Sequence, residues 1–191
     1  LELPVNIFSG EPPSSLGHLS SLQVVSLFDN QLIGTLPTEI GRLNKLTGCY
    51  LQGNQFNGTV PMEVGFMTSM RTLWLIDSQL TGTVPTEVGL LTDLEQLYLS
   101  HQNLTGTFPT EIGLLMMLQL LTIGANQITG TLPTEIGLMS NLLSLDVDSK
   151  QINGTLPTEV GFLTGLTSLL VFQNQLSGTL PTEIGLLLKL K

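Results

Sequence analysis

The chain has few of the residues that most enzymes and metal proteins depend on. Its 191 residues include one cysteine, Cys49, and two histidines, His18 and His101. A lone cysteine forms no disulfide within the chain, and no Cys/His spacing of a metal site is present. Neither histidine belongs to a metalloprotease motif, and no phosphate-binding loop motif occurs. We therefore expect no catalytic residue, no metal site and no cofactor. Cys49 falls at an apolar strand position, so we expect a small buried side chain.

Positive charge and long apolar runs are also scarce. The chain has 6 basic and 15 acidic residues, for a net charge of −9. Binding to nucleic acid requires Lys and Arg to neutralise phosphates, so neither nucleic acid nor an anionic membrane surface is an expected partner. The longest apolar runs, such as residues 114–118, fall far short of the roughly 18 residues that span a bilayer. We expect no direct membrane insertion by this segment.

What the chain does have is one segment repeated throughout. The sequence LTGTVPTEVG at residues 80–89 recurs in closely similar form every 24 residues, without insertion or deletion. The repeated prolines are Pro13, Pro37, Pro61, Pro85, Pro109, Pro133, Pro157 and Pro181. A fixed period in this range is the signature of a solenoid, in which neighbouring coils share one continuous core. We expect residues 1–191 to form a single solenoid of about eight coils. Neither end resembles a polar cap, so we expect a piece of a longer protein.

One coil shows the elements that the repeat predicts. Apolar residues alternate around Trp74, which predicts a short strand with its leucines inward and Trp74 outward. Alternation over residues 80–84 predicts a second short extended segment, which ends at Pro85 because proline has no ladder N–H. Thr86 is expected to cap a short helical turn, with Glu87 at the positive end of that turn.

The repeat resembles a known family. The frame LxxLxxLxLxxNxLxGxLPxxIG is similar to the plant-type leucine-rich repeat of receptor-kinase ectodomains and polygalacturonase-inhibiting proteins. The PTEIGLL version also resembles leucine-rich-repeat proteins of algae such as diatoms. The resemblance implies an α/β repeat solenoid, a right-handed superhelix with a concave parallel β-sheet. A short second sheet would lie on the flank, with short 3-10 or helical turns on the convex side. It also implies a receptor-like, non-enzymatic recognition module, extracellular or at the cell surface.

An asparagine ladder is part of that family pattern. It stands here at Asn30, Asn54, Asn126 and Asn174, where the side chains would satisfy buried backbone groups. We expect the ladder to be broken at Ser78, Gln102 and Lys150. Lysine cannot accept a hydrogen bond, so the turn at Lys150 should be looser, with the amine reaching water or Asp148.

The concave face carries the first candidate site. Strand positions that point outward there give the expected partner-binding residues Phe28, Tyr50, Trp74, Ile76, Tyr98, Asp146, Asp148 and Phe172. Exposed tyrosine and tryptophan are typical interface anchors, although they could instead only cover the sheet and stack on each other. By resemblance, the partner is a protein, a peptide or a glycan. Asp146 and Asp148 have the spacing of an inverting glycosidase pair or of Ca²⁺ ligands, but a solvated acidic patch is the simpler interpretation.

Two other surfaces give alternative functions. The residue after each repeated glycine is apolar in most coils, which predicts a convex apolar ladder if these side chains point outward: Phe66, Leu90, Leu114, Leu138, Phe162 and Leu186. Such a stripe usually marks an interface, here for homo-assembly, unless the turn rotates the side chains inward.

The flank carries a threonine column with a mixed companion column two residues earlier. The first consists of Thr35, Thr59, Thr83, Thr107, Thr131, Thr155 and Thr179, and the second of Ile33, Asn57, Thr81, Thr105, Thr129, Asn153 and Ser177. Thr-x-Thr arrays on flat sheets resemble those of ice-binding solenoids. The alternative is the ordinary preference of threonine for strands.

Three sequons, at Asn57, Asn103 and Asn153, predict N-glycosylation and hence a secreted glycoprotein. Glycans at Asn57 and Asn153 would prevent the flank from docking flat on ice.

Overall fold

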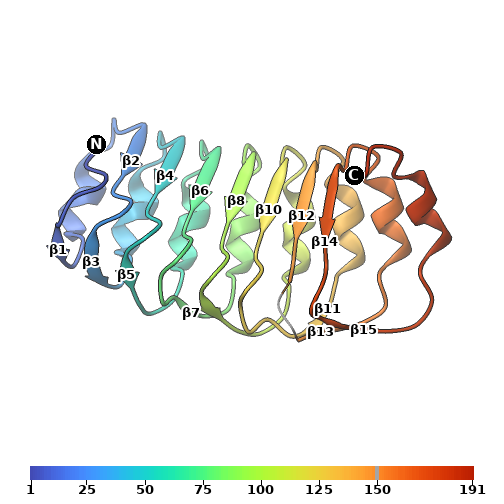
Figure 1. The fold of residues 1–191 in the computed structure, drawn as a ribbon. Helices are drawn as coiled ribbons and strands as arrows, with labels where there is room; N and C mark the ends of the chain where they lie inside the picture. Colours follow the sequence, from blue (N-terminus) through green and yellow to red (C-terminus); the bar gives the residue numbers. More distant parts are fainter. Residues whose placement is uncertain (149–150) are drawn as a thin grey trace.

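The alternating apolar residues form one short strand in each coil, as predicted. The computed structural model describes residues 1–148 and 151–191. The strands are β2 (Val24–Ser26), β4 (Gly48–Tyr50), β6 (Thr72–Trp74), β8 (Gln96–Tyr98), β10 (Leu120–Thr122), β12 (Ser144–Asp146) and β14 (Ser168–Leu170). They form a seven-stranded parallel sheet (Figure 1). Each residue pairs with the one 24 positions later, as Leu73 does with Leu97. Like positions therefore form columns on this sheet.

The inward residues of these strands form the core. Leu73, Leu97 and Leu121 are each at most 1% exposed. Cys49 is fully buried at the equivalent position of β4, as expected. Its burial raises the pKa of the thiol to about 12, because the thiolate would lose its hydration. Cys49 is thus a small apolar side chain of the core.

A second set of strands lies on the flank, but its register differs from the predicted one. The strands are β1 (Ser9–Gly10), β3 (Gln31–Gly34), β5 (Gln55–Phe56), β7 (Thr81–Gly82), β9 (Asn103–Leu104), β11 (Gly130–Thr131), β13 (Ile152–Gly154) and β15 (Gln175–Leu176). Here each residue pairs with the one 22 positions later: Thr59 lies opposite Thr81, and Thr107 opposite Thr129. The flank segments cross the stack obliquely, so the expectation that flank residues stack on their equivalents is wrong.

The third side of each coil is a short 3-10 helix that follows the repeated proline. These turns are η1 (Ser14–His18), η2 (Thr38–Arg42), η3 (Met62–Phe66), η4 (Thr86–Leu90), η5 (Thr110–Leu114), η6 (Thr134–Leu138), η7 (Thr158–Phe162) and η8 (Thr182–Leu186). The expectation that Thr86 caps its turn is wrong. Pro85 holds the cap position in extended backbone, which moves Thr86 into the turn. The Thr86 hydroxyl instead hydrogen-bonds to the Glu87 carboxylate, at 3.3 Å.

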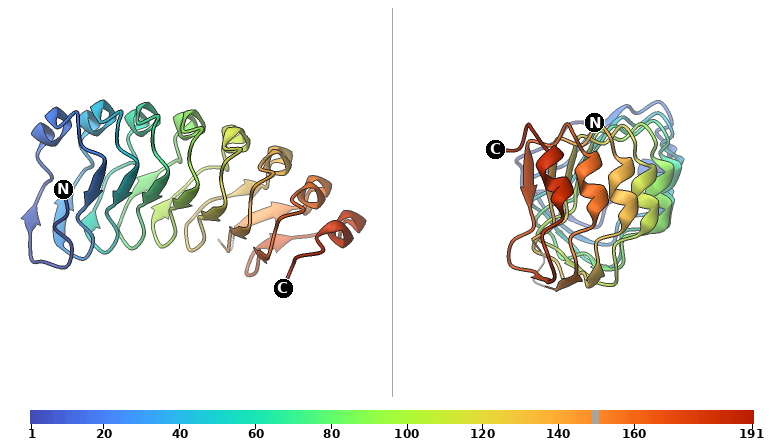
Figure 2. Two further views of the ribbon diagram at one scale, coloured as in Figure 1. Left: turned by 90° about the horizontal axis from the view of Figure 1, so that it is seen from above. Right: turned by 90° about the vertical axis from the view of Figure 1, so that its right-hand side faces the viewer.

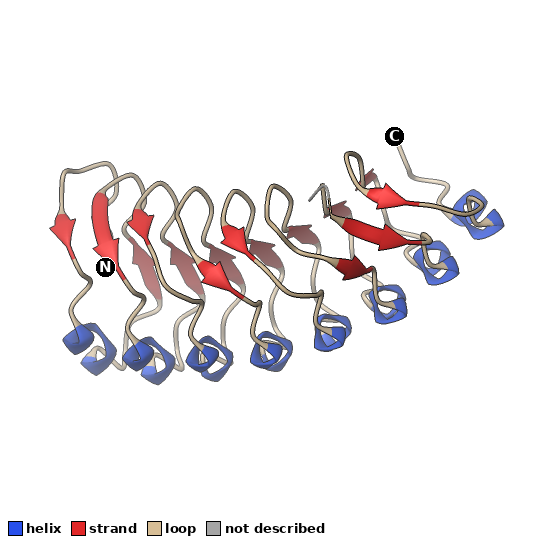
Figure 3. Cartoon of the chain, turned by 90° about the horizontal axis from the view of Figure 1, so that it is seen from below, coloured by secondary structure: helices blue, strands red, loops and turns tan. Residues whose placement is uncertain are grey.

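The coils stack into a curved rod. Seen from above, the helical turns follow the outer edge of the curve and the seven-stranded sheet lies inside it (Figure 2). Colouring by secondary structure shows the turns on one side and strands on the others (Figure 3). The seven-stranded sheet therefore forms the concave face, the turns form the convex side, and the two-to-four-residue strands form the flank. Within the described residues, no helix has the length and apolar character needed to span a bilayer.

The asparagine ladder satisfies backbone groups between coils. Asn54 donates to the carbonyls of Leu27 and Leu51, at 2.9 and 3.0 Å, and accepts from the amide of Leu32 at 3.0 Å. Asn126 makes the equivalent bonds three coils further along the chain. These bonds link each loop to the coil before it.

Gln102 continues this ladder, so the expected break there is wrong. Its side chain accepts from the Leu80 amide at 2.9 Å and donates to the Leu75 carbonyl, as the asparagines do in their coils. The longer side chain carries the same amide group to the same partners. Ser78 reaches only the Asn54 carbonyl, at 3.4 Å. Lys150 lies outside the described residues.

Candidate functional site

Three aromatic residues lie side by side on the concave face. Tyr50, Trp74 and Tyr98 end β4, β6 and β8 and are register partners. The ring centroids of Tyr50 and Trp74 are 5.3 Å apart with an interplanar angle of 82°, and those of Trp74 and Tyr98 are 4.9 Å apart. All three side chains are half-buried. The three rings thus form a strip of edge-to-face and tilted contacts along the concave face.

A groove lies at the N-terminal end of this aromatic strip. It has a volume of about 500 Å³ and is lined by Glu2, Val24, Ser26, Phe28, Tyr50, Gln52 and Trp74. Ile76 is half-buried in the loop that follows β6. Phe172 is 52% exposed beyond β14, with β10 and β12 between it and the strip. The fold therefore brings the predicted aromatic residues together, with the exception of Phe172.

Four buried polar atoms on the concave face have no hydrogen-bond partner among the described residues: Gln52 Oε1, Trp74 Nε1, Ser100 Oγ and Thr122 Oγ1. A buried donor or acceptor without a partner costs about 1–3 kcal/mol, so such atoms are rare in folded proteins. All four belong to β4 through β10 or to the loops that follow these strands. Their concentration on one face distinguishes the middle of the concave sheet from the rest of the described residues.

Asp146 and Asp148 lie together at the C-terminal half of the same face. The Asp148 amide donates to Asp146 Oδ1 at 3.3 Å. Burial raises the pKa of Asp146, the Asp148 amide bond opposes that rise, and the Asp148 carboxylate adds to it. Hydrogen bonding with the Asp148 side chain raises that pKa further. Nowhere in the described residues do three His, Cys, Asp or Glu side chains gather as metal ligands.

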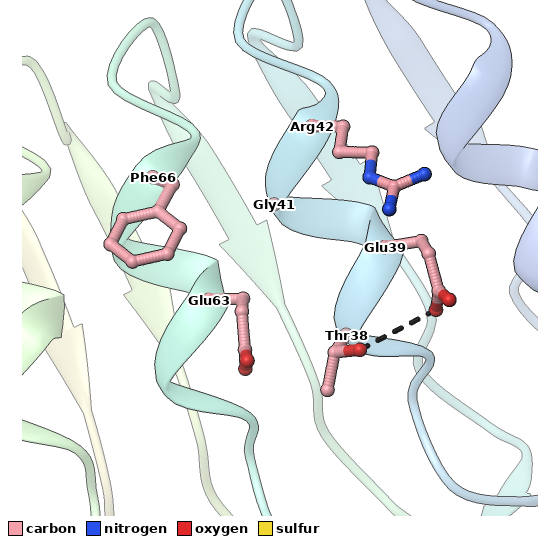
Figure 4. A pocket seen from close by; sticks show the side chains of 6 residues that line it. All are labelled: Thr38, Glu39, Gly41, Arg42, Glu63 and Phe66. Carbon is pink, nitrogen blue, oxygen red and sulfur yellow. Dashed lines mark hydrogen bonds between the residues drawn. The ribbon is translucent and has the colours of Figure 1, made fainter.

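The convex apolar ladder points outward. Phe66, Leu90, Leu114, Leu138, Phe162 and Leu186 are 47% to 61% exposed, so the alternative of an inward rotation is wrong. Figure 4 shows where the ladder begins: Phe66 on η3 takes the position that Arg42 holds on η2. A shallow pocket of about 280 Å³ lies there between the two turns.

The flank threonines are exposed, and several are held in one rotamer. The hydroxyls of Thr81, Thr105 and Thr129 donate to glycine carbonyls of the preceding coil, at 3.0, 3.3 and 3.1 Å. The methyl group of Thr83 packs over Gly106, where an added Cβ would lie 2.6 Å from it. The three sequon asparagines, Asn57, Asn103 and Asn153, are also exposed.

Comparison with known proteins agrees with this architecture. The Leucine Rich Repeat family matches residues 21–43 and 93–115. The ectodomain of the Arabidopsis thaliana membrane receptor kinase GASSHO1/SCHENGEN3 superimposes with a TM-score of 0.96 at 32% identity, over 99% of this chain and 23% of that one. The chain is a plant-type leucine-rich-repeat protein. The plant peptide hormone receptor RGFR1, in complex with RGF2, gives a TM-score of 0.84 at 30% identity, over 98% and 34% of the two chains.

This leucine-rich-repeat chain spans about a quarter to a third of the length of those two receptors. A plant ice-binding protein shares the fold, with a TM-score of 0.72 at 23% identity, over 95% of this chain and 74% of that one. The curated protein sequences give no match.

Sequence reasoning placed the aromatic strip but missed three residues of the leucine-rich-repeat face. Ser100, Thr122 and Gly124 lie between Tyr98 and the aspartates, and their outward strand positions could have drawn attention to them. Nothing in their residue types marks them, because serine, threonine and glycine are common throughout the repeat. Their role becomes visible only once the neighbouring side chains are in place.

Proposed function

We propose that this leucine-rich-repeat protein is a non-enzymatic recognition module that binds an extended protein or peptide segment on its concave face. The observation that carries the proposal is the Tyr50–Trp74–Tyr98 strip beside a groove lined by Gln52 and Trp74. Gln52 Oε1 and Trp74 Nε1 have no hydrogen-bond partner within the part of the chain that the structure describes. Aromatic side chains anchor interfaces because they bury a large area at a small cost in side-chain entropy. The peptide hormone complex of the related RGFR1 supports a peptide rather than a glycan as the partner.

The proposed location is extracellular. Support comes from the related GASSHO1/SCHENGEN3 chain, which is the ectodomain of a membrane receptor kinase. The exposed sequon asparagines Asn57, Asn103 and Asn153 support a glycoprotein. Mass analysis of the protein from a secreting eukaryotic host, before and after removal of N-glycans, tests both statements together.

The experiment for the proposed function uses peptides selected on the intact protein from a displayed random library. The Trp74→Ala variant should bind the selected peptides at least about 30-fold more weakly, since interface anchors contribute about 2 kcal/mol or more. Met116→Ala, at a 55% exposed apolar residue between η5 and β10 and outside the ladder, is the control and should leave affinity unchanged. Trp74 is the only tryptophan, so its fluorescence reports occupancy directly. Equal affinity of wild type and Trp74→Ala would exclude this face.

A second candidate function is ice binding by the flank, as favoured by the fixed threonine rotamers. The hydroxyl hydrogen bonds from Thr81, Thr105 and Thr129 to the preceding coil restrict rotation of these side chains before any ligand binds. Binding to ice would then lose less side-chain entropy. Thermal hysteresis tests this function. Replacing Thr83 and Thr107 with tyrosine should abolish hysteresis, whereas Thr110→Tyr on the convex side should not. Wild-type protein without hysteresis excludes the function.

A third candidate is homo-assembly through the convex apolar ladder, supported by the outward position of its six residues.

A further inference from the structure

Three neighbouring strands give the concave face a small regular grid. In the first row, Tyr98, Thr122 and Asp146 are register partners on β8, β10 and β12. In the second row, two residues later, stand Ser100, Gly124 and Asp148. Backbone bonds continue past the strands, from the His101 amide to the Gly124 carbonyl and from the Ala125 amide to the Asp148 carbonyl. Five of the six grid positions therefore present a side chain, and Gly124 presents none.

The missing side chain at Gly124 leaves a notch in the grid, into which the Asp148 carboxyl group reaches while that of Asp146 lies beside it. A Cβ added to Gly124 would lie 1.7 Å from Asp148 Oδ1 and 3.0 Å from Asp146 Oδ1. Both carboxyl groups thus lean over this glycine. The notch exists only because position 124 has no Cβ. The carboxyl groups that lie at it, those of Asp146 and Asp148, belong to the same coil.

Two hydroxyl groups stand at neighbouring positions of the grid, and neither has a hydrogen-bond partner among the described residues. Ser100 is 7% exposed, and its Oγ has no partner. Thr122 Oγ1, between Tyr98 and Asp146 in the first row, has none either. A buried hydroxyl without a partner is costly. Ser100 is the neighbour of Gly124 in the second row, and Thr122 is the neighbour of Asp146 in the first. The unpaired hydroxyls are an observation independent of the acidic pair.

The oxygen set of the notch matches one chemical class of ligand group. Two carboxylates and two hydroxyls can all accept hydrogen bonds, while a guanidinium carries five donors and no acceptor. A planar guanidinium also fits carboxylates with two parallel bonds. A cation between the two carboxylates offsets the charge of Asp148, which is one of the causes, beside burial, that raise the pKa of Asp146. The chain's net charge of −9 further favours a cationic partner.

We propose that the notch formed by Ser100, Thr122, Gly124, Asp146 and Asp148 binds an arginine side chain of the peptide ligand. This inference rests on the proposed function, because it assigns a second contact to the same bound segment. Trp74 on β6 and Asp146 on β12 are three strands apart, or about 14 Å at about 4.8 Å per strand. An extended peptide covers that distance in about four residues. The ligand therefore has an apolar residue over the aromatic strip and an arginine about four positions away.

The experiment titrates the intact protein with N-acetyl-arginine amide and follows the backbone amide of Gly124 by NMR. N-acetyl-citrulline amide is the matched probe, since citrulline has nearly the same shape without the charge. Arginine should give a saturable shift of the Gly124 signal, and citrulline none. The Asp146→Asn/Asp148→Asn variant should bind arginine at least about tenfold more weakly, because charged hydrogen bonds are lost. Ser100→Ala should also weaken binding, by a smaller factor.

The control variant removes the same amount of charge elsewhere. Asp93→Asn/Glu135→Gln changes one exposed aspartate and one glutamate of a convex turn, and it should bind arginine like wild type. The proposal is overturned if citrulline binds as well as arginine, or if the Asp146→Asn/Asp148→Asn variant, shown to be folded by circular dichroism, binds like wild type. It is also overturned if Ca²⁺ occupies the notch and excludes arginine.

A longer probe separates this proposal from the proposed function. The peptide acetyl-Phe-Gly-Gly-Gly-Arg-amide should change both the Trp74 fluorescence and the Gly124 signal, and its citrulline analogue should bind about tenfold more weakly. If both peptides change Trp74 equally and leave Gly124 unchanged, the arginine site fails while the concave recognition function stands. If arginine binds at Gly124 but the Trp74→Ala variant keeps the affinity for library-selected peptides, the function as proposed fails instead.

Discussion

Gly89 packs directly on the backbone of Glu111 in the next coil. A Cβ on Gly89 would lie 2.6 Å from the Glu111 carbonyl oxygen and 2.8 Å from the Glu111 Cβ. Except for Gly185 in the last coil, the glycines that end the other repeated segments have the same relationship to the following glutamate, as Gly113 has to Glu135. The convex turns therefore approach one another so closely that only glycine fits, which explains why this residue recurs in every coil.

Replacing Gly89 with alanine should destabilise the protein. The added methyl group collides with backbone rather than with a flexible side chain, so the coils must move apart. Overpacking of this kind costs about 1–3 kcal/mol. Chemical denaturation measures the change in the free energy of unfolding.

The control for Gly89→Ala is Gly185→Ala in the same 191-residue chain. Gly185 holds the equivalent place in η8, but an added Cβ would have no atom within 4 Å. We expect no loss of stability there, since nothing blocks the methyl group. Equal destabilisation by both substitutions would show that the contact with the next coil is not the cause.

The architecture was predictable because a period of 24 residues constrains every coil in the same way. Once Leu73 is assigned to the core, Leu97 and Leu121 must follow, and the structure buries all three. The outward position of Trp74 follows from the same alternation. The repeat thus predicted which side each strand residue faces, and it predicted the aromatic strip.

Features that depend on a side chain reaching across coils were not predictable from the period. Gln102 was expected to break the asparagine ladder, yet its longer chain carries an amide group to the backbone of Leu75 and Leu80. The notch at Gly124 depends on where two neighbouring carboxyl groups lean. The offset of 22 residues between Thr59 and Thr81 depends on how the flank crosses the stack. A sequence period contains none of these three-dimensional details.

Removing the Gln102 amide should therefore be costly. Gln102→Ala leaves the Leu80 amide and the Leu75 carbonyl buried without their partner, which should lower the free energy of unfolding by about 2–4 kcal/mol. Gln102→Asn introduces the residue found at Asn54 and Asn126 and should cost less than about 1 kcal/mol, because the amide group is kept. Gln79→Ala, at an exposed position, is the control. A loss from Gln102→Ala as small as that of Gln79→Ala would contradict the role of Gln102 in the ladder.

The Cys49 thiol should make the protein less stable in alkaline solution. Its folded pKa is about 12, against 9.0 for an ordinary thiol. Below pH 9 both states keep the proton, so stability is unaffected; above pH 9 only the unfolded state releases it. The free energy of unfolding should then fall between pH 9 and 12, by up to about 1.4 kcal/mol per pH unit.

Cys49→Ala isolates this effect. The variant loses some packing at every pH, but the difference between wild type and variant should shrink above pH 9. Reaction of native Cys49 with a thiol reagent should also be slow until the protein unfolds. A difference that stays constant from pH 7 to 11 would contradict the burial of the thiol.

Asp146→Asn should stabilise the protein at neutral pH. The folded pKa of Asp146 lies above its ordinary value of 3.8, mainly because of burial, so ionisation opposes folding. The stability that the protonated side chain contributes is fully present below pH 3.8 and is lost as the pH rises through the folded pKa. The variant should therefore gain stability at pH 7 and show no gain at pH 3. Asp93→Asn, at an exposed site, should show neither change.

The convex apolar ladder makes a prediction about assembly. If copies associate through it, the light-scattering mass at high concentration should exceed the 20.6 kDa of one chain. Leu114→Lys/Leu138→Lys places two charges in the ladder and should return the protein to one chain, because a buried unpaired ammonium is strongly unfavourable. Thr110→Lys/Thr134→Lys adds the same charges at exposed positions of the same turns, η5 and η6, outside the ladder. Assembly that survives in the threonine variant and not in the leucine variant locates the interface on the ladder. A wild-type protein that remains a monomer at high concentration excludes this function.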